Sequence, residues 1–280
     1  MKFSLVLATI NRSDEIKGFL QSLKKQTYRN FELIVVDQNL DKRLIPILKR
    51  FEEEFKIKHL CSEKGLSKAR NIGLKHIDGD VIAFPDDDCQ YPPDLLENVN
   101  GLLQEHSDWD GVTGKCLNFQ GNQSVGKFDI TEGKLNKFNC WKRATSITIF
   151  LREEVIRKVG DFDETLGAGA DTQWGSGEEI DYILRALKKR FNIMYVPDQV
   201  IALHPSIKEE YNDKMIKRHS SYSKGMGRVI SKHNYPIWFI SWYLIRAFGG
   251  VIINLLLLNF KKAHQYLVIL IGRFVGWNSI

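Results

Sequence analysis

The 280-residue sequence predicts an α/β fold built on a doubly wound, mostly parallel sheet. Three observations support this. Apolar, strand-like runs alternate with amphipathic helical runs through the first half of the chain. Short polar clusters follow three of these strands, which is where ligands of such sheets bind. With 43% hydrophobic residues, the chain can also bury a core of this size.

The elements of the first half follow one another as strand and helix. Residues 3–9 carry no charge and predict a buried strand, and residues 14–25 place Ile16, Phe19 and Leu23 on one helical face. The pattern continues with strands at 31–37, 57–60 and 80–84 and helices at 44–55 and 66–76. A further helix should begin at Leu95, because Pro92, Pro93 and Asp94 precede an amphipathic run.

After Gly111 the alternation fades, so we expect a mixed sheet in the second half. Strands are predicted at 112–117, 146–151 and 193–196 and from Ile201 toward His204, and helices at 152–159 and 178–190. Two glycine-rich loops, residues 121–133 and 167–177, separate them. The second loop holds four glycines and Trp174, a composition typical of a lid or substrate loop.

The C-terminal tail is basic and apolar. The chain has a net charge of +6, but no acid follows Asp213, and ten lysines and arginines lie beyond it. These cations flank apolar runs at 237–258 and 266–277, which favours an anionic membrane surface over nucleic acid as the partner. The first run approaches the roughly 20 residues that cross a bilayer, but Arg246 interrupts it. We therefore expect helices lying in the membrane interface, with an apolar dimer face or a packed helical subdomain as the alternative.

Three carboxylates, Asp86, Asp87 and Asp88, follow the strand that ends at Phe84 and Pro85. Carboxylates this close raise one another's pKa unless a cation lies among them, so a hard divalent metal is expected. The alternative is an acidic turn that caps the next helix. One cap needs only one carboxylate, which favours the metal.

Two other polar clusters should reach the same edge of the sheet. Thr9, Asn11 and Arg12 follow the first strand, and Asp37 and Gln38 follow the second. Parallel strands with right-handed crossovers end at one edge, so these side chains and the aspartates are expected to share a crevice.

Five segments in register resemble the family 2 glycosyltransferases, which are nucleotide-sugar enzymes with the Rossmann-like A-type (GT-A) fold. The resemblance covers roughly residues 3–205 and is carried by residues 7–12, 31–37, 65–73, 86–88 and 178–181. Ile10 and Gln38 depart from the family pattern near the nucleotide base, and Glu178–Glu179 stands where many relatives have Glu-Asp.

The resemblance implies a role for each motif residue. The residues expected to bind the donor come from the first four segments and the position after the second: Thr9, Asn11, Arg12, Asp37, Gln38, Arg70, Asn71, Asp86 and Asp87. Asp86 and Asp88 would hold Mn²⁺ or Mg²⁺, with His204 as a possible third ligand or a structural histidine. Arg70 would contact phosphate or the aspartates, or else lie on a solvated helix face.

The acidic motif would supply the general base. Glu179 is the favoured candidate, and Glu178 and Asp181 compete with it because acids at a helix start can also complement the helix dipole. Trp174 and Gly177 would contact the acceptor, with a core tryptophan as the alternative for Trp174.

The expected function is inverting sugar transfer from a UDP-, dTDP- or GDP-linked donor to a saccharide or lipid-linked saccharide, in cell-surface polysaccharide biosynthesis. The enzyme would consist of a nucleotide-sugar half at 1–110, an acceptor and catalytic half at 111–206, and a membrane-associated tail at 207–280. Four dispersed cysteines suit the cytoplasm, so a peripheral or monotopic protein on the cytoplasmic face of the membrane is expected. A homo-oligomer is compatible with this expectation.

Two other functions stay open. A sugar nucleotidyltransferase would need a glycine-rich loop after the first strand, where no glycine occurs before Gly18. A membrane-bound saccharide- or nucleotide-binding protein would carry the same site in vestigial form.

Overall fold

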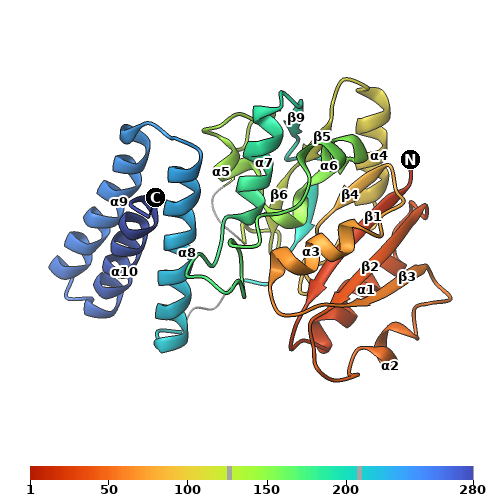
Figure 1. The fold of residues 1–280 in the computed structure, drawn as a ribbon, viewed down its shortest axis with the longest axis horizontal. Coiled ribbons are helices and arrows are strands. Elements are labelled where there is room, and N and C mark those ends of the chain that lie inside the picture. Colours follow the sequence, from red (N-terminus) through yellow and green to blue (C-terminus); the bar gives the residue numbers. More distant parts are fainter. Residues whose placement is uncertain (125–127, 207–209, 280) are drawn as a thin grey trace. The chain divides into compact units, whose positions relative to one another are not determined.

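The computed structural model describes residues 1–124, 128–206 and 210–279 (Figure 1). The chain forms two compact units. Unit 1 comprises Met1–Lys64, Lys68–Phe162 and Tyr182–Ile207, and unit 2 comprises Gly65–Ser67, Asp163–Asp181 and Lys208–Ile280. The segment Asp163–Asp181 therefore belongs to the same unit as the helical tail. The division into halves at residues 110 and 206 concerns ligand binding and stays a prediction.

Unit 1 is built on an eight-stranded sheet, which confirms the predicted mixed and mostly parallel architecture. In sheet order the strands are β3 (Lys56–Cys61), β2 (Phe31–Asp37), β1 (Phe3–Thr9), β4 (Val81–Ala83), β8 (Phe150–Arg152), β5 (Gly111–Thr113), β9 (Ile193–Tyr195) and β7 (Gly133–Lys134). The first four are parallel, whereas β8 runs antiparallel to both β4 and β5. The antiparallel β8 marks where the strict alternation of the sequence fades.

Helices cover both faces of the parallel strands. The core cluster on one face includes residues of β1, of α1 (Asp14–Lys24) and of α4 (Leu95–Glu105). On the other face, α3 (Leu66–Leu74) approaches β1 so closely that a Cβ at Gly73 would overlap Val6. The other helices before residue 190 are α2 (Ile45–Leu48), α5 (Cys140–Arg143), the 3₁₀ helix η1 (Ser146–Thr148), α6 (Glu153–Val159) and α7 (Glu178–Lys188). Residues 125–127 of the predicted loop at 121–133 lie outside the described residues.

The helix predicted at 44–55 was wrong in length, since α2 ends at Leu48 and turns follow at residues 49–54. Three glutamates at 52–54 would have occupied the C-terminal end of a longer helix, where the helix dipole disfavours negative charge. Phe51 and Phe55 instead turn inward, and the Phe55 ring lies 5.3 Å from that of Phe31.

The single strand predicted at 112–117 is two strands in two sheets. β5 ends at Thr113, and β6 (Lys115–Leu117) pairs with β10 (Ile201–Leu203) in a separate two-stranded sheet. Gly114 lies between them, where a Cβ would overlap the carbonyl of Val200. The predicted strand at 146–151 likewise begins as η1 and becomes β8 only at Phe150.

Unit 2 contains the predicted helical tail as three long helices, α8 (Asp213–Lys232), α9 (Ile237–Leu256) and α10 (Phe260–Trp277). α10 packs against both α8 and α9. Among the described helices, α9 alone is long and apolar enough to cross a membrane, with a mean hydropathy of 1.6. Large apolar side chains on α9 and α10 are exposed, including Trp238, Trp242, Ile245, Phe248, Ile252, Leu256, Phe260, Leu267, Ile271 and Phe274. These helices fit a membrane-associating segment.

Glycines permit the close packing of α8 on α10. A Cβ at Gly276 would overlap the carbonyl of Lys224, and one at Gly227 would overlap the carbonyl of Arg273. Because the obstacles are backbone atoms, a side chain can be accommodated only if the helices separate.

We expect Gly276→Ala to lower the free energy of unfolding by about 1–3 kcal/mol, the usual cost of an overpacked interface. Gly249→Ala on α9 is the matched control, because its Cβ would meet no atom within 4 Å. That control should leave stability unchanged or raise it by up to about 1 kcal/mol through helix propensity. Thermal unfolding of the two variants in the same detergent tests this, and equal midpoints would contradict it.

Candidate functional site

The ends of β1, β2 and β4 lie together at one edge of unit 1, as predicted. Thr9 and Asp37 are register partners in the parallel pair β1–β2, and Ala8 forms a bridge with Asp86. Thr9 Oγ1 donates a hydrogen bond of 2.6 Å to Asp87 Oδ2. The carboxyl edge of the sheet thus gathers the polar residues that follow these strands.

Arg12 binds two of the three aspartates. Its Nη1 atom donates to Asp87 Oδ1 at 2.7 Å and also contacts the Asp88 carboxylate. Burial raises the pKa of Asp87 to about 6, although the hydrogen bond from Thr9 and the charge of Arg12 act in the opposite direction. The repulsion between these acids is therefore met by a cation that the chain itself supplies, an arrangement that the sequence did not reveal.

His204 contacts the third aspartate of the motif. Its Nε2 atom lies 3.3 Å from Asp88 Oδ1, and its Nδ1 atom lies 2.7 Å from the carbonyl of Pro205. Burial would raise the pKa of Asp88, but His204 and Arg12 lower it to about 2. The contact arises because Gln90 and Leu203 exchange two backbone hydrogen bonds of 2.8 Å, which brings the end of β10 beside the aspartates.

Arg70 is buried, not on a solvated helix face. Its side chain is 1% exposed, and its guanidinium lies over the rings of Phe84 and Phe162 at 5.7 and 5.4 Å. The same group donates to Ser146 Oγ and lies 3.5 Å from Asp86 Oδ1. The positive charge of Arg70 therefore lies next to the carboxylate of Asp86.

Asn71 and Asn11 hold the backbone around the site. The Asn71 side-chain amide exchanges hydrogen bonds of 3.0 and 2.7 Å with the backbone of Phe162. Asn11 has φ of 58°, a left-handed conformation that asparagine tolerates, and its backbone N–H donates to Asn39 Oδ1 at 2.7 Å. The Gln38 backbone N–H donates to the carbonyl of Thr9 at 3.0 Å.

Asp37 has a neighbour that the sequence gave no reason to expect. His59 Nε2, on edge strand β3, lies 3.1 Å from Asp37 Oδ2, while Asn39 donates to the other carboxylate oxygen. The register of β3 on β2 sets this contact, and no motif in residues 57–60 indicates it.

The donor atoms at this edge fit Mn²⁺ or Mg²⁺ as a partial ligand set. Asp86 and Asp88 offer carboxylate oxygens, His204 offers a nitrogen, and the Asp86 side chain is 41% exposed. Across residues 1–124, 128–206 and 210–279, no three acidic, histidine or cysteine side chains converge into a closed cage. Such metals usually take one or two carboxylates and complete their shell with water and substrate phosphates. For a metal ion to bind Asp88, the contact of this carboxylate with Arg12 or with His204 would have to break.

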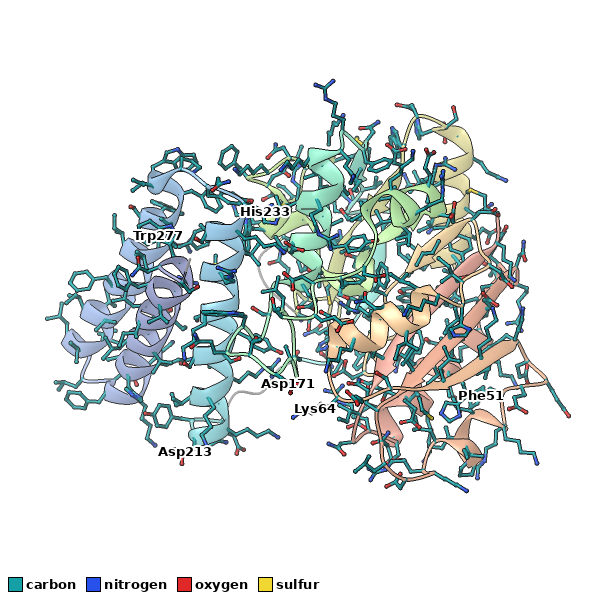
Figure 2. The ribbon with its side chains drawn as sticks, in the orientation of Figure 1. Phe51, Lys64, Asp171, Asp213, His233 and Trp277 are labelled. Carbon is teal, nitrogen blue, oxygen red and sulfur yellow. The ribbon has the colours of Figure 1, made fainter. Side chains whose placement is uncertain are left out.

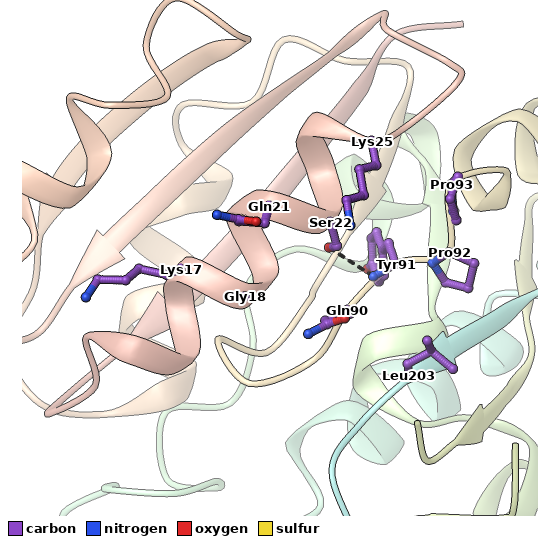
Figure 3. A pocket seen from close by; sticks show the side chains of 10 residues that line it. All are labelled: Lys17, Gly18, Gln21, Ser22, Lys25, Gln90, Tyr91, Pro92, Pro93 and Leu203. Atoms are coloured by element: carbon purple, nitrogen blue, oxygen red, sulfur yellow. Dashed lines mark hydrogen bonds between the residues drawn. The ribbon is translucent and has the colours of Figure 1, made fainter. Parts of the chain in front are cut away.

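A cavity of about 390 Å³ lies beside the backbone pair Gln90–Leu203 (Figure 3). The lining comes from α1, the segment 90–93 and β10, and contains Lys17 and Lys25 but no acid. None of the residues predicted to bind donor, metal or acceptor lines this cavity. It is therefore separate from the donor site expected from the sequence.

The predicted acidic motif lies in unit 2, at the first turn of α7. Asp181 is fully buried, with His233 Nε2 at 2.8 Å and Lys232 Nζ at 2.7 Å from its Oδ1 atom. Glu178 is also buried, whereas Glu179 is partly exposed. Of the three acids, Glu179 is the one whose side chain solvent or a ligand reaches most easily.

The predicted acceptor residues belong to the same segment of unit 2. Trp174 is partly exposed, and the guanidinium of Arg228 lies 6.0 Å from its ring centroid. Gly177 has φ of 94°, and a Cβ there would lie 2.8 Å from Val229 Cγ2. Both features restrict position 177 to glycine.

Comparison with known proteins identifies related sequences. The model of the family described as Glycosyl transferase family 2 matches residues 4–151, just over half of the chain. Glycosyltransferase AglE of Haloferax volcanii is 25% identical over 94% of this chain and 83% of its own. A UDP-Glc:alpha-D-GlcNAc-diphosphoundecaprenol beta-1,3-glucosyltransferase, WfgD of Escherichia coli, is 32% identical over 49% of this chain and 55% of its own.

Solved structures share the fold. The structure of S. aureus TarS 1-349 in complex with UDP-GlcNAc superposes with a TM-score of 0.64 at 17% identity, over 99% of this chain and 92% of the other. A mannosyltransferase from Pyrobaculum calidifontis in complex with GDP-Man and Mn²⁺ gives a TM-score of 0.64 at 14% identity, over 99% and 86% of the two chains.

Proposed function

Because this chain belongs to glycosyl transferase family 2 and is a glycosyltransferase acting on a nucleotide sugar, we propose that it is an inverting enzyme with a saccharide or lipid-linked saccharide as acceptor. The observation that carries the proposal is the meeting of Thr9, Asp37 and the aspartates at the carboxyl edge of the sheet. Ligands of open α/β sheets bind at such edges.

The donor side of the reaction is assigned to unit 1. A divalent cation held by Asp86 and Asp88, with His204 or substrate oxygens completing its shell, would supply positive charge for the departing diphosphate. Arg12 and Arg70 add cationic groups next to Asp88 and Asp86, respectively. The relative bound to GDP-Man and Mn²⁺ supports the choice of metal. Thr9, Asn11, Asp37, Gln38 and Asn71 shape the loops that would receive the nucleotide.

Glu179 is proposed as the general base. As the acceptor hydroxyl oxygen bonds to the anomeric carbon, the bond from that carbon to the diphosphate oxygen breaks, and the diphosphate leaves with the electron pair. The hydroxyl proton passes to the carboxylate of Glu179. Attack opposite the leaving group inverts the anomeric centre. Glu178 is buried, and Asp181 is buried and bound by Lys232 and His233, which makes both poorer candidates.

A membrane surface is the proposed location of the reaction. The exposed apolar side chains of α9 and α10 lie among lysines and arginines, with no acid after Asp213. Arg246 stacks on Trp242 at 5.7 Å, an arrangement that suits the depth of lipid headgroups. The name of WfgD describes an acceptor on a diphosphoundecaprenol carrier. We therefore propose a lipid-linked acceptor and a peripheral or monotopic protein on the cytoplasmic face.

Donor turnover by the full-length protein tests the proposal. UDP-, dTDP- and GDP-linked sugars are each incubated with Mn²⁺ or with a chelator, with and without lipid-linked saccharides, and release of nucleoside diphosphate is measured. The expected result is acceptor-stimulated, Mn²⁺-dependent release from one donor class. Nucleotide binding without transfer would favour the vestigial binding protein, and pyrophosphate release from a nucleoside triphosphate and a sugar phosphate would favour the nucleotidyltransferase.

A further inference from the structure

Lys232 and His233, at the end of α8, hold the buried acid of the predicted acidic motif. His233, which caps α8 (Figure 2), lies with Nε2 2.8 Å from Asp181 Oδ1. Lys232 Nζ lies 2.7 Å from the same oxygen and donates to Asp163 Oδ2 at 2.6 Å. Asp181 itself is 0% exposed. A buried carboxylate is tolerated only where partners of this kind compensate the lost hydration, so the first turn of α7 depends on these contacts.

The loop that precedes the acidic motif also contacts α8. The N–H of Gly175 donates to the Ser221 carbonyl at 3.1 Å, and Ser176 Oγ donates to the Tyr222 carbonyl at 2.8 Å. A Cβ at Gly225 would overlap the backbone of Ser176. The loop and the acidic motif therefore lie against α8 from Ser221 to its C-terminal cap.

Another part of α8 faces α10. Gly227 allows the backbone of α10 to approach, as described above, and His219 Nε2 lies 3.1 Å from Gln265 Nε2. α8 therefore contacts two parts of unit 2. Some of its residues bind the segment that carries the acidic motif, and others pack against α10.

We propose that Lys232 and His233 are positioning residues for sugar transfer, which hold Asp181 and thereby fix the orientation of the turn that carries Glu179. The inference rests on the proposed function, since it takes Glu179 as the base. Glu179 and Asp181 are two residues apart in the first turn of α7, so the backbone that Asp181 fixes is the backbone that aims Glu179. Displacement of a catalytic group by about 1 Å can lower a rate by roughly 100-fold.

His233→Leu in the full-length protein tests the proposal, with His219→Leu as the matched control on the same helix. We expect His233→Leu to lower kcat by about 10- to 100-fold while the KM for the donor changes less than about twofold. His233→Gln should recover most of kcat, because its amide can donate to Asp181. His219→Leu should keep the kcat of the wild type. An unchanged kcat in His233→Leu, or equal losses in both leucine variants, would overturn the proposal.

Lys232→Met provides a second route if His233→Leu does not fold, because the Lys232 side chain is 30% exposed. It should also lower kcat without a matching change in donor KM, and wild-type kcat in a folded Lys232→Met protein would equally overturn the proposal. Glu179→Gln measured alongside separates the two hypotheses. If Glu179→Gln is inert while His233→Leu is fully active, Glu179 remains the proposed base and the positioning role of His233 is rejected. If Glu179→Gln is active, the assignment of the base fails.

Discussion

Glu179→Gln should lower the rate of sugar transfer by roughly 10²- to 10⁴-fold, the range that general base catalysis contributes. The substitution keeps the shape of the side chain and removes its ability to accept the hydroxyl proton. Because Glu179 is partly exposed and glutamine has nearly the same size, the fold should be retained. Donor affinity should change little, since the assigned donor residues lie elsewhere in the chain. Single-turnover transfer and calorimetric binding of the nucleoside diphosphate with Mn²⁺ measure the two quantities separately.

The neighbouring acids are the controls for this experiment. Glu178→Gln should be less damaging to transfer than Glu179→Gln. Asp181→Asn removes the negative charge between Lys232 and His233, so it should reduce stability as well as activity. If Glu178→Gln abolished transfer and Glu179→Gln did not, the base would be Glu178.

Much of the fold of unit 1 could be predicted because its signals are local. β1 and β2 were predicted to the residue, since both are mostly apolar runs that are buried on both faces. Once the strands are known to be parallel, the meeting of Thr9, Asp37 and Asp86 follows from topology alone. α2 failed for the opposite reason, because its length was decided by the packing of Phe51 and Phe55 and not by local periodicity.

The partners of the site residues could not be predicted in the same way. Arg12 was expected at the donor, but its contacts with Asp87 and Asp88 depend on two loops that lie more than 70 residues apart. The burial of Arg70 against two phenylalanine rings likewise requires the fold. Lys232 and His233 carry no motif, and the sequence presents them as part of a basic tail. The sequence shows that the tail is basic, but only the structure shows that Lys232 and His233 contact Asp181.

Asp88→Ala should reduce metal-stimulated transfer by roughly 10²- to 10³-fold, the scale on which loss of a charge-stabilising group affects a transition state. The variant removes a proposed metal ligand and frees both His204 and Arg12 from their shared carboxylate. Two effects therefore oppose each other. A metal ion would no longer compete with Arg12 for this carboxylate, but it would have one oxygen ligand fewer, and the guanidinium of Arg12 would remain nearby to repel it. We expect the second effect to dominate, because Mn²⁺ and Mg²⁺ depend on carboxylate oxygens for most of their protein affinity.

Initial rates measured against Mn²⁺ concentration, after treatment with a chelator, give the test. Asp88→Ala should need more Mn²⁺ for half-maximal activity and should reach a lower maximum. Asp14→Ala is the control, since that acid is exposed at the start of α1 and pairs with Lys17 at 2.7 Å. Transfer at the wild-type rate by Asp88→Ala would remove the metal from the proposed mechanism. Stabilisation of the diphosphate would then fall to Arg12 and Arg70, the cations that the structure already places beside Asp86 and Asp87.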